Sequence, residues 1–170
     1  MFVDSSRYNW YVIYTMPKAE KRVFNLLYKN NCQVFLPLYR KTIQWSDRKK
    51  KILAPLFPNY IFAFLNQNDL HSIYGIPGFV KFLSTRGQKD TVPQREIDSI
   101  KLLLQSNPRV SNERILVGDI MVVKKGPLQG LVGIVIEKRG SAKLAVRIES
   151  LALNLVVEIS PDQVKPIQLD

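Results

Sequence analysis

The chain has 170 residues, enough for one large domain or two small ones, and its 46% hydrophobic and 23% charged residues are typical of a folded globular protein. A chain that is disordered throughout is therefore excluded. The single cysteine, Cys32, cannot build a disulfide framework or a cysteine-based zinc site. No apolar stretch approaches the roughly 20 residues of a membrane span and no secretory signal is visible, so we expect a cytoplasmic protein without membrane contact.

The net charge of +11 is unevenly distributed. Residues 1–110 carry 17 Lys and Arg against 7 Asp and Glu, whereas residues 111–170 carry 8 against 7. An excess of cations attracts polyanions, chiefly nucleic acid or an anionic membrane. The two parts of the chain are therefore expected to meet different partners, unless the surplus lysines of the first part serve only solubility.

The first part alternates between strand and helix patterns. Residues 10–14 are rich in aromatic and β-branched side chains, which predicts a strand. Pro17 then opens a helix with apolar residues at helical spacing, and Asn30 and Asn31 end it. A second strand is predicted at 34–38.

The next segment is polar and basic, and it predicts a hairpin arm that projects from the sheet. Its cations are Arg40, Lys41 and the run 48–51, with Trp45 between them. Beyond the arm we expect, in order, a strand at 56–65, a short helix at 69–74, a turn at 75–78, a strand at 79–83 and a helix that begins at Pro93 and carries Ile97, Ile100 and Leu104. This order predicts a small α+β domain with an antiparallel sheet.

Residues 106–114 are polar, contain a proline and lack any period, so they are predicted to be a linker between domains at 1–105 and 115–170. After the linker the pattern contains only strands. Runs at 120–123, 133–137, 142–148 and 155–159 are rich in β-formers and separated by glycines. Short strands in this arrangement favour a small β-barrel, which leaves few exposed edges.

Both faces of the predicted N-terminal sheet are apolar. Because side chains alternate along a strand, Tyr60, Phe62 and Phe64 share one face, and Ile61, Ala63 and Leu65 share the other. An antiparallel sheet with one solvated face would show polar residues on that face. Either helices cover both faces, or part of one face is open and binds a partner.

The cations at 48–51 have two interpretations. They are either a solvated surface or a site that binds nucleic-acid phosphates, with Trp45 close by.

The sequence offers little for catalysis. The glycines between 126 and 133 lack the lysine and the helix of a phosphate-binding loop. Without paired carboxylates or a metal-spaced cluster we expect neither an enzyme nor a cofactor, and Cys32 and His71 are expected to have packing and surface roles.

Three motifs make the chain resemble the NusG family of transcription factors. They are Trp10-Tyr11-Val12 at the start of the first strand, the Leu-Phe-Pro-Asn-Tyr-Ile-Phe segment at 56–62, and a KOW-type turn. The residues of the turn are Gly126, Pro127, Leu128, Gly130 and Gly133. Their order and spacing span residues 8 to 167.

The resemblance implies a NusG-type N-terminal domain that binds the clamp helices of the largest RNA polymerase subunit through an apolar cleft. The matching cleft positions are Tyr14, Tyr60, Phe62, Phe82 and Ile97. It also implies that basic residues hold upstream or non-template DNA. The candidates for this contact are Lys18, Arg22, Arg40, Lys41, Arg48, Lys49, Lys50 and Lys51.

The resemblance further implies a C-terminal KOW barrel that recruits a small-subunit ribosomal protein or a termination factor, in a chain that acts as a monomer. Where housekeeping members carry a Phe-Gly-Arg turn, this chain reads Leu151-Ala152-Leu153, so Leu151 is the expected partner contact. This departure is more similar to the specialised RfaH and UpxY paralogues, which act as antiterminators on long surface-polysaccharide operons. The alternatives are a housekeeping elongation factor and a ribosome-associated KOW protein that binds RNA.

Overall fold

The computed structural model describes residues 8–44, 49–106, 108–111, 119–138 and 141–167. The N-terminal sheet contains β2 (Gln33–Phe35), β5 (Tyr60–Asn66), β1 (Tyr8–Thr15) and β6 (Phe79–Phe82) in that order, and the short β9 (Thr91–Val92) also pairs with β1. All of these pairings are antiparallel. The predicted α+β class of this domain is thus confirmed.

Helices cover both faces of the N-terminal sheet. Helix α1 (Glu20–Lys29) and the 3-10 helix η2 (Gln67–Ile73) pack on the face that carries Tyr11 and Ile13. Helix α2 (Gln94–Leu103) packs on the opposite face, against Trp10, Val12 and Phe62. Of the two explanations for a doubly apolar sheet, coverage by the chain's own helices therefore accounts for most of its area.

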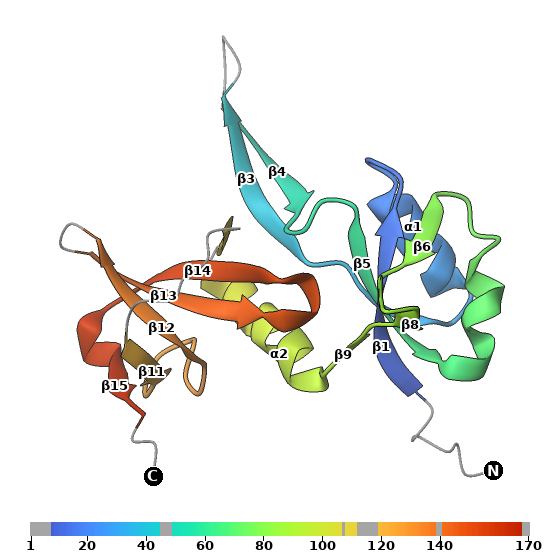
Figure 1. Cartoon of the computed structure of the whole chain (residues 1–170). Helices are drawn as coiled ribbons and strands as arrows, with labels where there is room; N and C mark the ends of the chain where they lie inside the picture. The colour runs from blue at the N-terminus through green and yellow to red at the C-terminus, as the bar shows by residue number, and fades with distance from the viewer. Residues whose placement is uncertain (1–7, 45–48, 107, 112–118, 139–140, 168–170) are drawn as a thin grey trace.

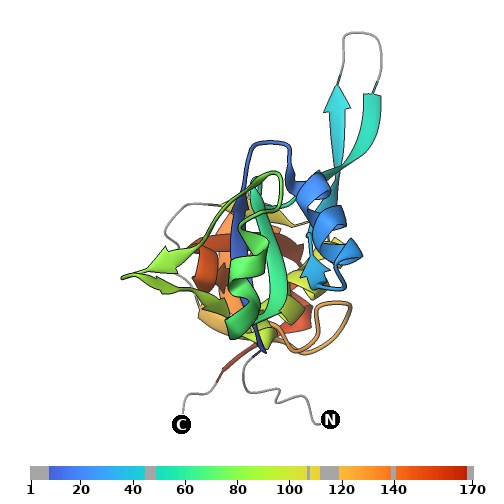
Figure 2. The ribbon, with the colours of Figure 1, turned by 90° about the vertical axis from the view of Figure 1, so that its right-hand side faces the viewer.

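The predicted hairpin arm is present. It consists of β3 (Leu38–Gln44) and β4 (Lys49–Pro55), which pair only with each other among the described strands. Figures 1 and 2 show the arm projecting away from the rest of the molecule. Its root is held by the amide of Leu56, which donates to the carbonyl of Pro37, and by Lys21 of α1, whose Nζ donates to the carbonyl of Leu53.

The C-terminal sheet has six antiparallel strands in the order β10-β14-β13-β12-β11-β15. Their bounds are β10 (Arg109–Ser111), β11 (Asp119–Val123), β12 (Val132–Lys138), β13 (Ser141–Ile148), β14 (Leu153–Ile159) and β15 (Val164–Pro166). The sheet-rich character predicted for this part of the chain is confirmed. The segment expected to be a linker contributes β10, which pairs with β14, so its central residues are ordered by backbone hydrogen bonds.

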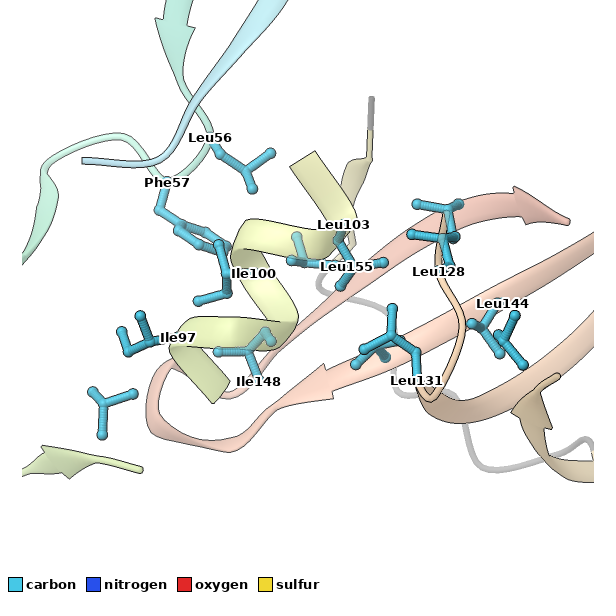
Figure 3. Packing of buried hydrophobic residues seen from close by; sticks show 14 of the residues in the cluster. Leu56, Phe57, Ile97, Ile100, Leu103, Leu128, Leu131, Leu144, Ile148 and Leu155 are labelled. Carbon is cyan, nitrogen blue, oxygen red and sulfur yellow. The ribbon is translucent and has the colours of Figure 1, made fainter. Parts of the chain in front are cut away.

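Helix α2 joins the two sheets into one hydrophobic core. Ile97, Ile100 and Leu103 have no exposed surface, and they belong to the same cluster as Ile148 and Leu155 of the C-terminal sheet. Figure 3 shows α2 between Phe57 and Leu56 on one side and the strands carrying Leu144 and Leu155 on the other. The third buried position is Leu103 instead of the expected Leu104, which lies in the following 3-10 turn η3 (Leu104–Ser106) and is half-buried.

Two predicted strands are shorter than expected, because backbone turns interrupt them. The strand predicted at 34–38 splits into β2 and β3, around Leu36 and Pro37. The strand predicted at 56–65 begins only at Tyr60, because Asn59 adopts a left-handed conformation with φ of 70°. A small hairpin of β7 (Ser84–Thr85) and β8 (Gln88–Lys89) was not predicted.

Gly133 tests the packing of the C-terminal sheet. A methyl group at this position would lie 2.5 Å from the backbone carbonyl oxygen of Ala145 and 2.9 Å from Cδ1 of Leu144. Because a backbone oxygen in a paired strand cannot move aside, Gly133→Ala should lower the free energy of unfolding by about 1–3 kcal/mol. Urea denaturation measures this change. Gly75→Ala, where nothing lies within 4 Å, is the control and should change stability by less than about 0.5 kcal/mol.

Candidate functional site

Tyr14 and Tyr60 form an aromatic rim at one end of the N-terminal sheet. They are register partners on β1 and β5, and their rings meet edge to face with centroids 5.4 Å apart. Both side chains are half-buried. The turn before Tyr60 is fixed by Asn59, whose amide donates to Oε1 of the buried Glu20 at 2.9 Å. Because the neighbouring turn holds the rim in place, its two rings are ordered before any partner binds.

The other expected cleft residues are buried, and they do not share one face. Phe62 has no exposed surface and packs against Phe35 and Phe57, with centroids 5.9 and 6.1 Å away. Ile97 is equally buried on α2. Phe82 pairs with Ile13 and lies in the core on the α1 side of the sheet. The structure therefore groups Tyr14, Tyr60, Phe62 and Ile97 on the α2 side and separates Phe82 from them.

A polar contact joins α2 to the C-terminal sheet. Glu96, only 8% exposed, accepts a hydrogen bond from Oγ of Ser150 at 2.6 Å and a longer one from its backbone amide at 3.3 Å. Ser150 belongs to η4 (Glu149–Leu151), the turn that contains the expected partner contact Leu151. Leu151 itself is half-buried against the shared core. No local pattern in the sequence predicts this contact, because the two residues are 54 positions apart.

The turn at Leu151 also has a strained backbone. Ala152 has a φ of 52°, in the left-handed region that favours glycine. Nη1 of Arg147 donates to its carbonyl at 2.9 Å, which holds the turn in place.

The predicted basic residues are on the surface where the structure describes them. Lys18 follows β1 and Arg22 lies on α1, and both are exposed. Of the arm cations, Arg40 and Lys41 on β3 and the three lysines of β4 are exposed. Arg48 and Trp45 lie outside the described residues. Lys21 of α1 adds a further cation at the root of the arm, where its Nζ donates to the carbonyl of Leu53.

The predicted KOW-type turn lies between β11 and β12. Gly126 and Gly130 have φ of 90° and 89°, and the amide of Gly130 donates to the carbonyl of Val123 to close the turn. Leu128 is buried in the core and Pro127 is exposed. The turn thus connects the neighbouring strands β11 and β12 and contributes Leu128 to the core.

Cys32 and His71 have the packing and surface roles that were expected from the sequence. Cys32 packs against the core on the α1 side of the sheet, and burial raises the pKa of its thiol, which lowers its reactivity as a nucleophile. His71 is exposed on η2. Within the described ranges no group of three or more His, Cys, Asp or Glu side chains could hold a metal ion. No helix in that part of the chain is long and apolar enough to cross a membrane.

The comparison with known proteins decides the family. A family model described as "Transcription termination factor nusG" matches residues 8–101, more than half of the chain. The chain belongs to the NusG family. It is 26% identical over 168 residues to the transcription termination/antitermination protein NusG of Rickettsia bellii, and 27% identical over 172 residues to that of Rickettsia prowazekii. Both matches cover 92% of this chain and 88% of the relative.

A solved structure supports the same fold over nearly the whole chain. It is described as "Domain interaction in Thermotoga maritima NusG" and has a TM-score of 0.57 at 22% sequence identity. The match covers 96% of this chain and 99% of that one. Family membership makes this chain a NusG-type transcription termination/antitermination factor.

Ser150 provides a test of the contact between α2 and the C-terminal sheet. Ser150→Ala leaves the buried carboxylate of Glu96 without its shortest hydrogen bond, which should cost about 1–3 kcal/mol. Hydrogen exchange at the amides of α2 and η4 should accelerate about 5- to 100-fold. Ser99→Ala is the matched control, because its hydroxyl donates to the carbonyl of Arg95 within α2. Unchanged exchange in Ser150→Ala would show that this contact does not hold the two parts together.

Proposed function

We propose that this chain is a non-enzymatic elongation and antitermination factor that docks on the paired clamp helices of RNA polymerase. The observation that carries the proposal is the aromatic rim of Tyr14 and Tyr60, which is half-exposed and lies on the face of the sheet that α2 covers. Large aromatic side chains held in place are the usual anchors of a helix-in-groove interface. Phe62 and Ile97 are buried in the hydrophobic cluster against which Tyr60 packs.

Docking on the clamp requires the C-terminal sheet to move. In the structure this sheet packs against α2 and helps bury Ile97, Ile100 and Leu103, whereas the two rings of the rim stay half-exposed. Release of the sheet would expose the apolar side chains of α2 that face it in the shared core. The relative from Thermotoga maritima, whose description names a domain interaction, supports treating this arrangement as a property of the fold.

Exposed cations supply the contact with DNA in this proposal. Lys18 and Arg22 lie near the aromatic rim, because the loop after β1 and the start of α1 are at the same end of the sheet as Tyr14. The arm projects outward (Figure 2), and its described cations are exposed. A factor that grips both the clamp and the DNA favours the closed clamp, and it lowers the population of paused polymerase through its higher affinity for that state.

The Leu151 turn supports a specialised role over a housekeeping one. Leu151-Ala152-Leu153 stands where the resemblance places the Phe-Gly-Arg turn of housekeeping members, and Ala152 at its centre has a left-handed backbone. We therefore assign it a partner contact with a small-subunit ribosomal protein or a termination factor, and an antitermination role on long operons such as surface-polysaccharide clusters. Position of the gene at the head of such an operon would favour this role; a ribosome-associated KOW protein would instead bind RNA without polymerase.

Capture by core polymerase tests the docking surface. Tyr60→Ala should weaken capture by about 2 kcal/mol, or roughly 30-fold in affinity, if the rim is an energetic hot spot. Tyr28→Ala is the matched control, because it removes a tyrosine that is 68% exposed on α1. Ser150→Ala should strengthen capture by releasing the C-terminal sheet. Equal capture of the Tyr60→Ala and Tyr28→Ala variants would rule out the rim as the anchor.

A further inference from the structure

The arm of β3 and β4 carries cations on both of its faces. Residues directly opposite each other in an antiparallel pair point to the same side. The pairs Arg40↔Leu53, Thr42↔Lys51 and Gln44↔Lys49 therefore place three cations, Arg40, Lys49 and Lys51, on one face. The alternate pairs Lys41↔Ile52 and Ile43↔Lys50 place Lys41 and Lys50 on the other face.

A ribbon that lies flat on a charged surface needs cations on one face only. Here all five cations are exposed, and no described residue of the arm is acidic. Charges on both faces match a site with phosphates on both sides of the ribbon. The two backbones that border a nucleic-acid groove provide such a site.

The dimensions of the arm select among the grooves. Each strand has seven residues, so the arm is roughly 20 Å long at about 3.3 Å per residue. The major groove of B-form DNA, about 12 Å wide and 8.5 Å deep, admits a two-stranded β-ribbon, whereas the minor groove, about 6 Å wide, does not. The major groove of an RNA helix is too narrow for side chains to enter.

The described side chains of the outer arm favour a duplex over a single strand. Proteins that hold single strands stack the bases on aromatic rings. At 40–44 and 49–53, the described outer part of the arm, the uncharged side chains are aliphatic or polar, and none of these described residues is aromatic; Trp45, which follows Gln44 in the sequence, lies outside the described residues. Tyr39, at the root of the arm, is half-buried and packs against the hydrophobic core.

We infer that the arm inserts into the major groove of B-form duplex DNA, with Arg40, Lys49 and Lys51 on one phosphate backbone and Lys41 and Lys50 on the other. This inference rests on the proposed DNA contact and specifies its ligand as a duplex. The arm is fixed at its root by the Lys21 and Pro37 hydrogen bonds, so it enters the groove as a preformed element. Phosphate contacts of this kind position the protein without reading sequence.

The experiment compares the two faces of the arm in the intact chain. Binding to a DNA duplex of roughly 20 base pairs is measured by fluorescence anisotropy over a series of salt concentrations. Each lost phosphate contact lowers the slope of log affinity against log salt by about 0.9. The triple variant R40Q/K49Q/K51Q should therefore lower the slope by about 2.7, and the double variant K41Q/K50Q by about 1.8. The control K124Q/K165Q removes two exposed cations near the KOW-type turn and should leave the slope unchanged.

Further measurements locate the arm and test the competing ligands. Bound protein should protect guanine N7, which lies in the major groove, from dimethyl sulfate, and both arm variants should lose this protection. The inference is overturned if only one face changes the slope, if N7 stays reactive, or if single-stranded DNA or duplex RNA binds as tightly as duplex DNA. Polymerase capture by both arm variants should remain at the level of the unmodified chain. An arm that does not bind duplex DNA is thus distinguished from a Tyr14 and Tyr60 rim that does not bind polymerase.

Discussion

Helix α2 is apolar on two sides, and the arrangement of the molecule depends on where those two sides are buried. One side covers the N-terminal sheet and the other meets the C-terminal sheet, which is why Ile97, Ile100 and Leu103 have no exposed surface. Burial of an aliphatic side chain contributes about 1.5–3 kcal/mol of stability. Separating the two sheets therefore costs only the burial energy on the side of α2 that meets the C-terminal sheet, together with the Glu96–Ser150 contact. A partner that offers α2 an equivalent apolar surface can therefore replace the C-terminal sheet.

Much of the fold could be predicted from the sequence, because local patterns encode it. Alternation along β1 and β5 assigned the residues of both sheet faces, and helical spacing located α1 and α2. The errors lie where single residues override the pattern. Asn59 turns the chain just before Tyr60, and Pro37 follows the end of β2, so two predicted strands are shorter. The β7–β8 hairpin was missed because its strands have two residues each, although Gly87, with a φ of 80°, marks its turn.

The candidate site was predicted less completely, because its parts depend on tertiary packing. The motif at 56–62 pointed to Tyr60 and Phe62, and the structure explains that motif through the Asn59–Glu20 hydrogen bond. Alternation alone could not show that Phe82 lies on the opposite face from Phe62, since that depends on how β6 registers with β1. The docking of the C-terminal sheet on α2 had no local signal at all. It joins residues with no periodic relation in the sequence.

We propose that the C-terminal sheet covers α2 in the free chain and leaves it when polymerase binds. Methyl-labelled nuclear magnetic resonance tests this most directly, through cross-relaxation between the methyl groups of Leu103 of α2 and Leu155 of β14, which belong to the same hydrophobic cluster (Figure 3). We expect strong cross-peaks between them in the free chain and their loss once core polymerase is added. The absence of these cross-peaks in the free chain, with the two parts tumbling independently, would contradict this proposal. Cross-peaks that persist after polymerase is added would contradict it as well.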